Sequence, residues 1–356
     1  EIMHTPGHTP ESISVLVYER ASDEVPYGVL TGDALFIGDV GRPDLLASIG
    51  VTADELGRML YDSVQHKLMG LDDAVRVFPA HGAGSACGKN LSTETQSTIG
   101  EQRRFNYACQ PMSEDRFLEL VTAGQPSAPE YFVFDAILNR KERATYDGRP
   151  AEPLSLHEAL AAAESGAALL DAREAPEFAA GHLRGAINVP VHGRFAETAG
   201  MVLDPHQEVV VLAPDGHESE VVVRLARIGF DHVLGYVPEV DAVLAEVPEH
   251  LAQASRVTPV QLEAAFADGT EVTVLDLRNL GELEAGSLPG SLHIPMAELR
   301  RRLDEVPRDG ALVLYCAGGW RSSVGASYLR SQGFTDVSDI LGGFSAWEAT
   351  RTPVEV

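Results

Sequence analysis

The chain has 356 residues, of which 44% are hydrophobic and 22% are charged, and its formal net charge is −26. This length is too great for one ordinary core and predicts two or three domains. The negative charge disfavours nucleic acid as a partner, because a phosphate backbone would be repelled. No apolar run approaches the roughly 20 residues of a membrane span, so no membrane partner is expected. Three widely spaced cysteines argue against a disulfide framework and favour the cytoplasm.

The N-terminal third places histidine and aspartate at the ends of short predicted strands. His8 lies on the turn "HTPGHTPES", Asp33 ends the strand in "GVLTGDALF", and His81 follows the strand in "VRVFPAHGAGSACGK". Ligands on turns at strand ends can converge on one edge of a sheet. These residues are too far apart in the sequence for a zinc finger and suit the metal site of an enzyme. The alternative is that each has an ordinary role in a turn.

Other features of this third leave alternatives open. Arg42 in "GDVGRPD" could bind a substrate carboxylate through a bidentate contact, or form a salt bridge within its loop. Cys87 is close to His81 in the sequence and is interpreted as a bystander thiol. Residues 93–107 begin with a capping signal and predict a polar helix that covers the site. The chain begins "EIMHTPGHTP" without an initiator methionine, so we expect an upstream part of this domain to be missing.

A repeat divides the rest of the chain. Residues 169–191, "LLDAREAPEFAAGHLRGAINVPV", align with 274–296, "VLDLRNLGELEAGSLPGSLHIPM", and 209–219 align with 312–322. Each copy alternates short β-branched runs with helical periodicity, which predicts parallel strands covered by helices. The stretch "YDGRPAEP" is the expected linker before the copies. The predicted domains are 1–145, 146–252 and 253–356.

In the second copy, "YCAGGWRSS" puts a cysteine at the end of a strand and a glycine-rich loop before a helix. Backbone N–H groups and the helix N-terminus would stabilise a thiolate there, and Gly318 and Gly319 would let the backbone approach closely. Cys316 is therefore a candidate nucleophile. The alternative is an inert core cysteine.

The spacing of this loop bears on what it holds. Arg321 completes a C-x4-R pattern, whereas cysteine phosphatases use C-x5-R to surround a tetrahedral oxyanion. The smaller ring suits a persulfide better than a phosphate. Ser322 belongs to the same loop, and Trp320 is interpreted either as a gate or as a packed side chain.

The first copy carries an altered version of the loop. In "LAPDGHESE", Ala213 stands at the position of the cysteine and Glu218 at that of the arginine. Without a thiol there is no covalent sulfur carriage, and a carboxylate would repel an anionic ligand. We expect this copy to be a scaffold, with a retained ligand-binding role, to which His217 could contribute, as the alternative.

Both copies resemble rhodanese domains, on "LDLR…G…LPGSLHIP" and on the six-residue loop after the second-copy strand. The resemblance implies that Cys316 takes a sulfane sulfur from a donor and passes it to a thiol acceptor. The first copy resembles a degenerate rhodanese. We interpret Asp276 and Arg278 as a structural polar pair.

The N-terminal third resembles the C-terminal half of a metallo-β-lactamase fold domain, in the persulfide dioxygenase branch that is fused to rhodaneses. The stretches "TPGHT", "TGDALFIGDVGRPDL" and "PAHGAGSACGKNLSTET" carry the resemblance. It implies Fe(II), with zinc as the alternative, and an αββα sandwich ahead of two small parallel-sheet α/β domains. Carried over, His8 and Asp33 are ligands and His81 is a nearby or additional metal residue. The H-x-H-x-D-H loop of that fold is expected upstream of Glu1.

These expectations combine into one sulfur-metabolism enzyme. The front domain would oxidise a small-molecule thiol persulfide with O2 to sulfite, and Cys316 would move sulfane sulfur between persulfide and sulfite or thiosulfate. The alternatives are a dinuclear metal hydrolase of the glyoxalase II type that carries a rhodanese, and a non-catalytic sulfur carrier or regulator. The identity of the thiol, the direction of sulfur flow and assembly as a homo-oligomer stay open.

Overall fold

The computed structural model describes residues 1–44, 50–82, 87–89, 91–125, 127–142, 148 and 150–351. They form two compact units, Glu1–Ala128 and Pro129–Val356, and each is described by itself. No helix in these ranges combines the length and the apolar character that crossing a bilayer would need.

The first unit is built on one mixed sheet in the order β1-β2-β3-β4-β5. β2 runs antiparallel to both β1 and β3, β3 runs parallel to β4, and β4 runs antiparallel to β5. The parallel pair is important for function, because the ends of β3 and β4 meet at the same edge of the sheet. The strands are β1 (Ile2–His4), β2 (Ile13–Val17), β3 (Gly28–Gly32), β4 (Arg76–Pro79) and β5 (Ser97–Thr98).

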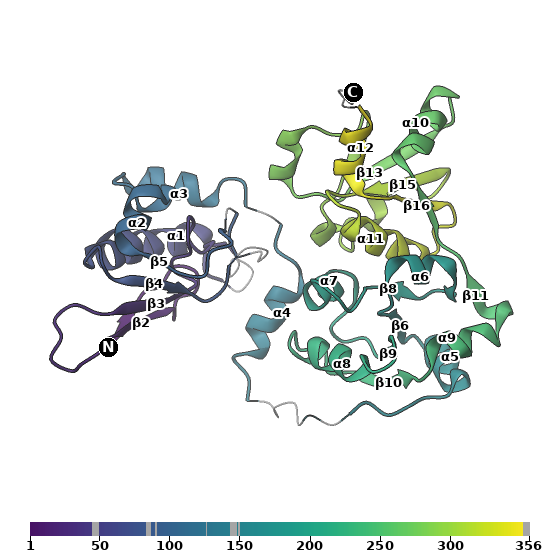
Figure 1. The fold of residues 1–356 in the computed structure, drawn as a ribbon, viewed down its shortest axis with the longest axis horizontal. Helices are drawn as coiled ribbons and strands as arrows, with labels where there is room; N and C mark the ends of the chain where they lie inside the picture. Colours follow the sequence, from purple (N-terminus) through teal and green to yellow (C-terminus); the bar gives the residue numbers. More distant parts are fainter. Residues whose placement is uncertain are drawn as a thin grey trace, which may run out of the picture. The chain divides into compact units, whose positions relative to one another are not determined.

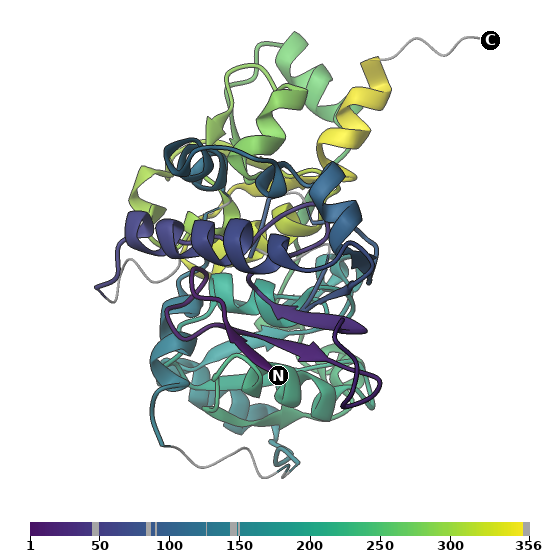
Figure 2. The ribbon, with the colours of Figure 1, turned by 90° about the vertical axis from the view of Figure 1, so that its left-hand side faces the viewer.

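Helices cover one side of this sheet (Figure 2). Two of them begin with capping boxes, in which Thr52 pairs with Glu55 and Thr98 pairs with Glu101. The polar helix expected over 93–107 begins only at Ile99 and ends at Phe105, because Ser97 and Thr98 pair with β4 as the strand β5. The helical segments are α1 (Ala53–Tyr61), the π-helical turn η2 (Asp62–Lys67), the short turns η3 (Leu68–Gly70) and η4 (Tyr107–Cys109), α2 (Ile99–Phe105) and α3 (Glu114–Thr122).

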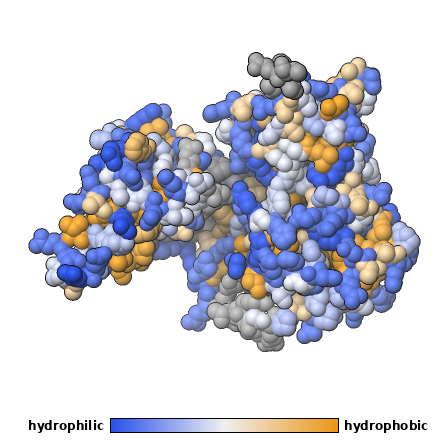
Figure 3. Space-filling view, viewed as in Figure 1, coloured by the Kyte–Doolittle hydropathy of each residue, from blue (hydrophilic) through white to orange (hydrophobic). Residues whose placement is uncertain are grey.

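The opposite side of the sheet is apolar and exposed. Ile2 pairs with Val15, and Val15 pairs with Leu30, so these side chains form a row across β1, β2 and β3. Ile2 is 68% exposed and Leu30 is 46% exposed. Apolar surface is visible on this unit in Figure 3. The described part of the unit therefore contains one sheet with helices on one side, as in half of an αββα sandwich.

The second unit begins with α4 (Tyr131–Leu138), which packs on the first copy. Tyr131 lies against Gly200, where a Cβ atom would come within 2.4 Å of its ring, and Leu138 lies equally close to Gly229. The sequence analysis assigned these residues to the front domain, up to residue 145. The packing places the division at Ala128/Pro129 instead, because the two glycines provide the contact surface. Of the expected linker 146–153, residues 146, 147 and 149 lie outside the described residues.

The first copy is a parallel sheet in the order β10-β9-β6-β8. The described end of the expected linker extends this sheet, since Pro153 pairs with Tyr236 at its edge. The elements are α5 (Leu156–Glu164), β6 (Ala168–Asp171), α6 (Ala175–Ala180), β7 (His182–Leu183), β8 (Ile187–Asn188), α7 (Phe195–Val202), β9 (Val209–Leu212), α8 (Glu218–Ala226), β10 (Val233–Val237), α9 (Val240–Ala245), η5 (Pro248–His250) and β11 (Leu251–Ala252), which pairs with β7.

The second copy repeats the design, with a parallel sheet in the order β12-β16-β15-β13-β14. Parallel strands connected by covering helices are what the alternating periodicity predicts for both copies. The elements are β12 (Ser255–Val257), α10 (Pro259–Ala267), β13 (Val272–Asp276), η6 (Leu280–Ala285), β14 (Leu292–His293), η7 (Met296–Glu298), η8 (Leu303–Glu305), β15 (Ala311–Tyr315), α11 (Trp320–Ser331), β16 (Val337–Ile340) and α12 (Gly343–Arg351).

One hydrophobic cluster spans both copies. It includes Leu170 and Phe195 of the first copy together with Leu277 and Leu329 of the second, and all four are fully buried. Helices α7 and α11 lie side by side where the copies meet (Figure 1). The copies therefore share a core and are not connected by the chain alone.

Candidate active site

Cys316 lies directly after β15, and its sulfur is held by the loop that follows. The backbone N–H of Gly319 donates to Sγ at 3.1 Å, and the Ser322 hydroxyl donates to the same atom at 3.5 Å. Gly319 is the N-cap of α11 and has a φ of 96°, a left-handed conformation that favours glycine. Cys316 is 1% exposed. An amide, a hydroxyl and a helix N-terminus therefore surround the sulfur, and all three favour negative charge on it.

The start of α12 holds the other side of the loop. The N–H of Phe344 donates to the carbonyl of Cys316 at 2.7 Å, and the N–H of Ser345 donates to that of Ala317 at 3.0 Å. At Gly343, whose φ is 58°, a Cβ would lie 2.3 Å from the Cys316 carbonyl oxygen. Because these two carbonyls point toward α12, the N–H groups in the same trans peptides, those of Ala317 and Gly318, point away from α12.

Gly318 and Gly319 differ in how closely other backbone atoms approach them. At Gly319 a Cβ would lie 3.2 Å from the nitrogen of Gly342, so a close backbone approach accompanies its positive φ. At Gly318 a Cβ would meet no atom within 4 Å. The expected close approach therefore applies to Gly319, and nothing in the structure explains glycine at position 318.

Arg321 makes a bidentate ion pair with Glu282, which the sequence analysis did not predict. Its Nη1 and Nη2 atoms donate to the two carboxylate oxygens at 2.7 and 2.6 Å. Burial would lower the pKa of Arg321, but the pair with Glu282 outweighs burial and raises it. Burial likewise opposes ionisation of Glu282, yet Arg321 brings the pKa of this carboxyl below its usual range. Both groups are therefore charged, and Glu282 largely neutralises the arginine beside Cys316.

A signal for Glu282 exists in the sequence. In the aligned copies Glu282 stands opposite Glu177, and each accepts a hydrogen bond from the backbone three residues earlier in a capping box. Only the second copy has an arginine at the loop position, because Glu218 replaces it in the first. The joint presence of Glu282 and Arg321 in one copy could have indicated the pair.

Asp276 and Arg278 lie below the loop and are both buried. Arg278 Nη2 donates to the Asp276 carboxylate at 2.6 Å and to the carbonyl of Gly286 at 2.7 Å. The Tyr315 hydroxyl also donates to Asp276. This network connects the end of β13 with the end of β15. It therefore fixes the backbone directly before Cys316.

Trp320 packs against the first copy. Its indole N–H donates to the hydroxyl oxygen of Thr198, on α7, at 3.2 Å. Its ring also faces Gly193, where a Cβ would lie 3.4 Å away. Of the two interpretations offered by the sequence, the structure shows the packed side chain, and it adds Thr198, which no local pattern marks.

In the first copy the equivalent loop has no thiol. Ala213 is buried at the end of β9, and Glu218 is the first residue of α8. His217 lies 3.1 Å from the carboxylate of Glu220, and its ring is 5.2 Å from that of His192 in an edge-on contact. The arrangement provides no nucleophile at this position.

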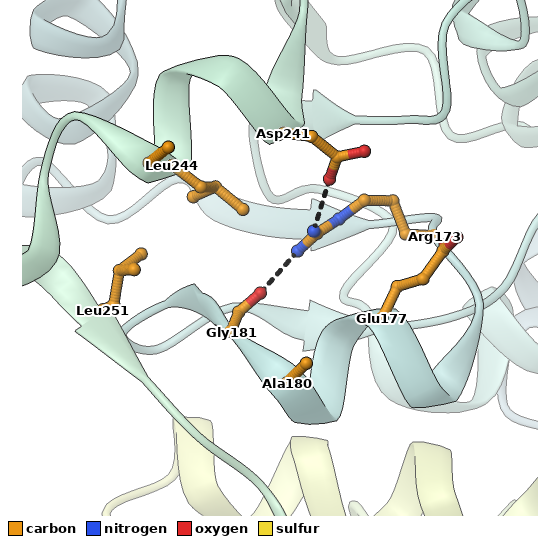
Figure 4. A pocket seen from close by; sticks show the side chains of 8 residues that line it. Arg173, Glu177, Ala180, Gly181, Asp241, Leu244 and Leu251 are labelled. Atoms are coloured by element: carbon orange, nitrogen blue, oxygen red, sulfur yellow. Dashed lines mark hydrogen bonds and ion pairs between the residues drawn. The ribbon is translucent and has the colours of Figure 1, made fainter.

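A shallow cavity of about 340 Å³ lies elsewhere on the first copy, beside Arg173 (Figure 4). The guanidinium of Arg173 is already used, since it donates to Asp171, to Asp241 and to the carbonyl of Gly181. Arg173 and Asp171 occupy the positions of Arg278 and Asp276 in the repeat. The cavity therefore borders a structural pair.

The N-terminal unit brings His8, Asp33 and His81 to the edge where β3 and β4 end. His81 Nε2 lies 2.8 Å from Asp33 Oδ1, and His8 Nε2 lies 3.9 Å from Asp33 Oδ2. The carbonyl of Arg42 lies 3.1 Å from His8 Nδ1. The expected convergence is present, because all three residues follow or face neighbouring strand ends.

The electrostatics of this edge follow from burial and from the shared carboxylate. Burial lowers the pKa of His8, whereas contact with Asp33 and then with Cys87 raises that of His81 to about 9. Burial opposes ionisation of Asp33, but the two histidines bring its pKa below the usual value. Cys87 therefore belongs to the surroundings of His81.

Whether these residues fit a metal ion depends on their free donor atoms. Asp33 Oδ1 lies 2.8 Å from His81 Nε2, and contacts with Asp33 and Cys87 raise the pKa of His81, so both side chains already have polar partners. Carboxylate oxygens and imidazole nitrogens are the donors that zinc and iron sites use. However, the described ranges contain no group of three or more histidine, cysteine or acidic side chains arranged to hold a metal. His8 and Asp33 thus fit as part of a ligand set and do not complete one.

Arg42 is 2% exposed, and its guanidinium is engaged within its own loop. Nε and Nη2 donate to the two carboxylate oxygens of Asp44 at 2.7 and 2.6 Å. This is the loop salt bridge that the sequence analysis gave as the alternative to substrate binding. A substrate carboxylate would have to compete with Asp44 for this face of the guanidinium, so substrate binding by Arg42 stays a prediction.

Comparisons with known proteins agree with this description. The rhodanese-like domain family matches residues 155–238 and 258–350. A sulfurtransferase of Allochromatium vinosum is 34% identical over 93 residues, which is 26% of this chain and 87% of that protein. The thiosulfate sulfurtransferase GlpE of Pseudoalteromonas translucida is 38% identical over 82 residues, which is 23% of this chain and 78% of that protein.

A solved structure extends the similarity to the larger part of the chain. The metallo-β-lactamase from Staphylococcus aureus superposes with a TM-score of 0.60 and 32% identity, over 67% of this chain and 68% of that one. The fold is therefore a metallo-β-lactamase-like N-terminal part followed by parallel-sheet domains, as the sequence predicts. Together with the family match and the geometry around Cys316, these similarities show that the chain belongs to the rhodanese-like family.

Proposed function

We propose that the second copy is a sulfurtransferase in which Cys316 carries a sulfane sulfur. The observation that supports this best is the contact of the Gly319 amide with Sγ at 3.1 Å, at the N-terminus of α11. This environment stabilises the thiolate, which is the reactive form, and would stabilise the charge on a terminal persulfide sulfur.

The transfer would proceed in two balanced steps. With thiosulfate, the Cys316 thiolate attacks the outer sulfur, the bond to the sulfonate sulfur breaks, and sulfite leaves with the electron pair. The cysteine then carries a persulfide. An acceptor thiolate attacks its outer sulfur, the S–S bond to Cys316 breaks, and the thiolate of Cys316 returns as the acceptor becomes a persulfide. No oxidant or reductant is needed.

The test is replacement of Cys316 by serine, with Cys109→Ser as the matched control. Burial raises the pKa of Cys109 to about 12, so this thiol is not a nucleophile at neutral pH. We expect C316S to abolish thiosulfate-dependent transfer and the mass increase of one sulfur atom per chain, and C109S to retain both. Transfer by C316S would refute the assignment.

For the N-terminal unit we propose iron-dependent oxidation of a small-molecule thiol persulfide by O2: the S–S bond breaks, the thiol is released, and the outer sulfur becomes sulfite with two oxygens from O2 and one from water. The proposal is supported by the convergence of His8, Asp33 and His81 at one edge of the sheet. Fe(II) held there would bring O2 and the persulfide together. His8 and Asp33 would supply two of the ligands. Fusion with the sulfurtransferase would keep a labile persulfide at high effective concentration.

The experiment measures O2 uptake with glutathione persulfide, together with metal content, on the full-length protein. His8→Ala is compared with His4→Ala, because His4 ends β1 just before the turn that carries His8, is exposed, and lies 2.8 Å from the carbonyl of Pro10. We expect H8A to lose iron and O2 uptake together and H4A to keep both. Two zinc ions per chain without O2 uptake would instead support the glyoxalase II type of hydrolase.

A further inference from the structure

The first copy contacts the Cys316 loop through the hydroxyl of Thr198, which both accepts and donates a hydrogen bond. Thr198 Oγ1 accepts from the Trp320 indole at 3.2 Å, while its own proton goes to the carbonyl of Arg194 at 2.7 Å. The hydroxyl oxygen can therefore act only as an acceptor toward Trp320. Thr198 is 3% exposed, so water does not readily replace this bond if it is lost.

The segment that carries Thr198 is itself held in place by the helix after the altered loop. Arg224 of α8 donates to the carbonyls of Val191 and, at 2.6 Å, of Gly193. Its guanidinium also lies over the ring of Phe195, 5.3 Å from the centroid. The chain from Val191 to Phe195 thereby forms a fixed surface, and Gly193 on that surface faces the Trp320 ring.

A second contact fixes α11 two turns further along. The Ser327 hydroxyl oxygen accepts from the N–H of Asn188, on β8, at 2.9 Å. Trp320 and Ser327 are seven residues apart and so lie on the same face of the helix. The first copy therefore holds α11 both at its N-terminus and in its middle.

The peptide between Gly319 and Trp320 connects these contacts to the sulfur of Cys316. Trp320 follows Gly319, whose N–H donates to Cys316 Sγ. We propose that Thr198 is a positioning residue for sulfur transfer: by holding Trp320 it keeps the Gly319 amide on the sulfur, so the first copy, which lacks a nucleophile, forms part of the working site. This inference rests on the proposed function of Cys316.

The test is a double-mutant cycle of Thr198→Val and Trp320→Phe in the whole protein, with kcat/KM for thiosulfate-dependent transfer as the readout. Thr198→Val removes the acceptor and keeps the shape of the side chain, whereas Trp320→Phe removes the donor together with part of the ring that faces Gly193. We expect T198V to lower kcat/KM about tenfold, the scale of one lost buried hydrogen bond, and W320F to lower it at least as much. The double variant should lose no more than W320F alone. Thr198→Ser, which retains the acceptor, should recover wild-type activity to within about twofold.

A readout separate from activity is the emission of Trp320. The chain has two tryptophans, and Trp347 is buried in a different cluster. T198V should therefore shift the emission spectrum, and T198S should not. The control is Thr122→Val, because Thr122 makes the same bond to the carbonyl four residues earlier, at 2.7 Å, in the other unit.

The outcomes separate the two proposals. If the wild-type protein shows no Cys316-dependent transfer, the proposed function fails. If it transfers sulfur but the losses in the cycle simply multiply, or T198V matches the wild type in both activity and emission, the role of Thr198 is overturned. Should T198V fail to fold, W320F and T198S decide, because full activity of W320F would refute the inference.

Discussion

Replacing Glu282 with glutamine removes the charge that faces Arg321 and preserves the size of the side chain. The two hydrogen bonds at 2.6 and 2.7 Å are charge-assisted. Breaking a fully buried ion pair costs about 3–5 kcal/mol, whereas an exposed pair contributes about 0–1 kcal/mol. The side chains of Arg321 and Glu282 are 24% and 32% exposed. This intermediate exposure gives an expected loss of about 2 kcal/mol in the free energy of unfolding.

Glu177→Gln is the matched control, because Glu177 makes the same capping contact in the first copy and has Glu218 where Arg321 would be. It should change stability by less than about 0.5 kcal/mol. The assay is urea denaturation followed by tryptophan fluorescence, which reports on the second copy because both tryptophans lie there. Equal effects of E282Q and E177Q would show that the ion pair contributes nothing.

The pH dependence of this difference provides a second check. The folded-state pKa of Glu282 lies below its usual value because of Arg321. The stabilisation is therefore fully present above the unfolded pKa of about 4.3 and is lost as pH falls through the lower folded value. The gap in stability between wild type and E282Q should close in acid. A gap that persists below that range would contradict the assignment to this carboxylate.

Two further predictions concern backbone strain and a buried histidine. Gly343→Ala should lower kcat/KM for sulfur transfer and destabilise the protein more than Gly310→Ala, since both glycines have positive φ but only at Gly343 would a Cβ clash with Cys316; equal effects in a melting experiment would refute this. Burial lowers the pKa of His182, which is stacked on Phe178, to about 4. Stability should therefore fall by up to about 3 kcal/mol as pH drops from 6.5 to 4, and His182→Phe should lose this component of the pH dependence in acid denaturation.

Much of the fold follows from local pattern. The repeat predicts two parallel α/β domains because each copy keeps the same succession of buried strands and amphipathic helices. The position of Cys316 follows as well, since an apolar strand that ends before two glycines and a helix leaves little choice of geometry. His8, Asp33 and His81 meet because they belong to neighbouring strand ends.

What the sequence did not reveal depends on packing between segments. Thr198 is the one hydroxyl residue of α7, but no local pattern marks it, and only the approach of α11 gives it a partner in the second copy. The assignment of α4 failed for the same reason, because Gly200 and Gly229 form its contact surface only when the first copy is folded. Asp44 is only two residues from Arg42, so the sequence allowed this pair to be considered. The sequence does not show, however, whether an arginine binds a neighbouring carboxylate or that of a substrate.

The cluster shared by the two copies bears on how a duplicated domain persists. If the second copy folded independently, a first copy without the cysteine could be deleted from the chain without loss of stability. Here Leu277 and Leu329 of the second copy are buried in the same cluster as Leu170 and Phe195 of the first. Deleting the first copy would expose that apolar surface, so the requirement for stability alone is a reason to keep a copy that has no cysteine at this position.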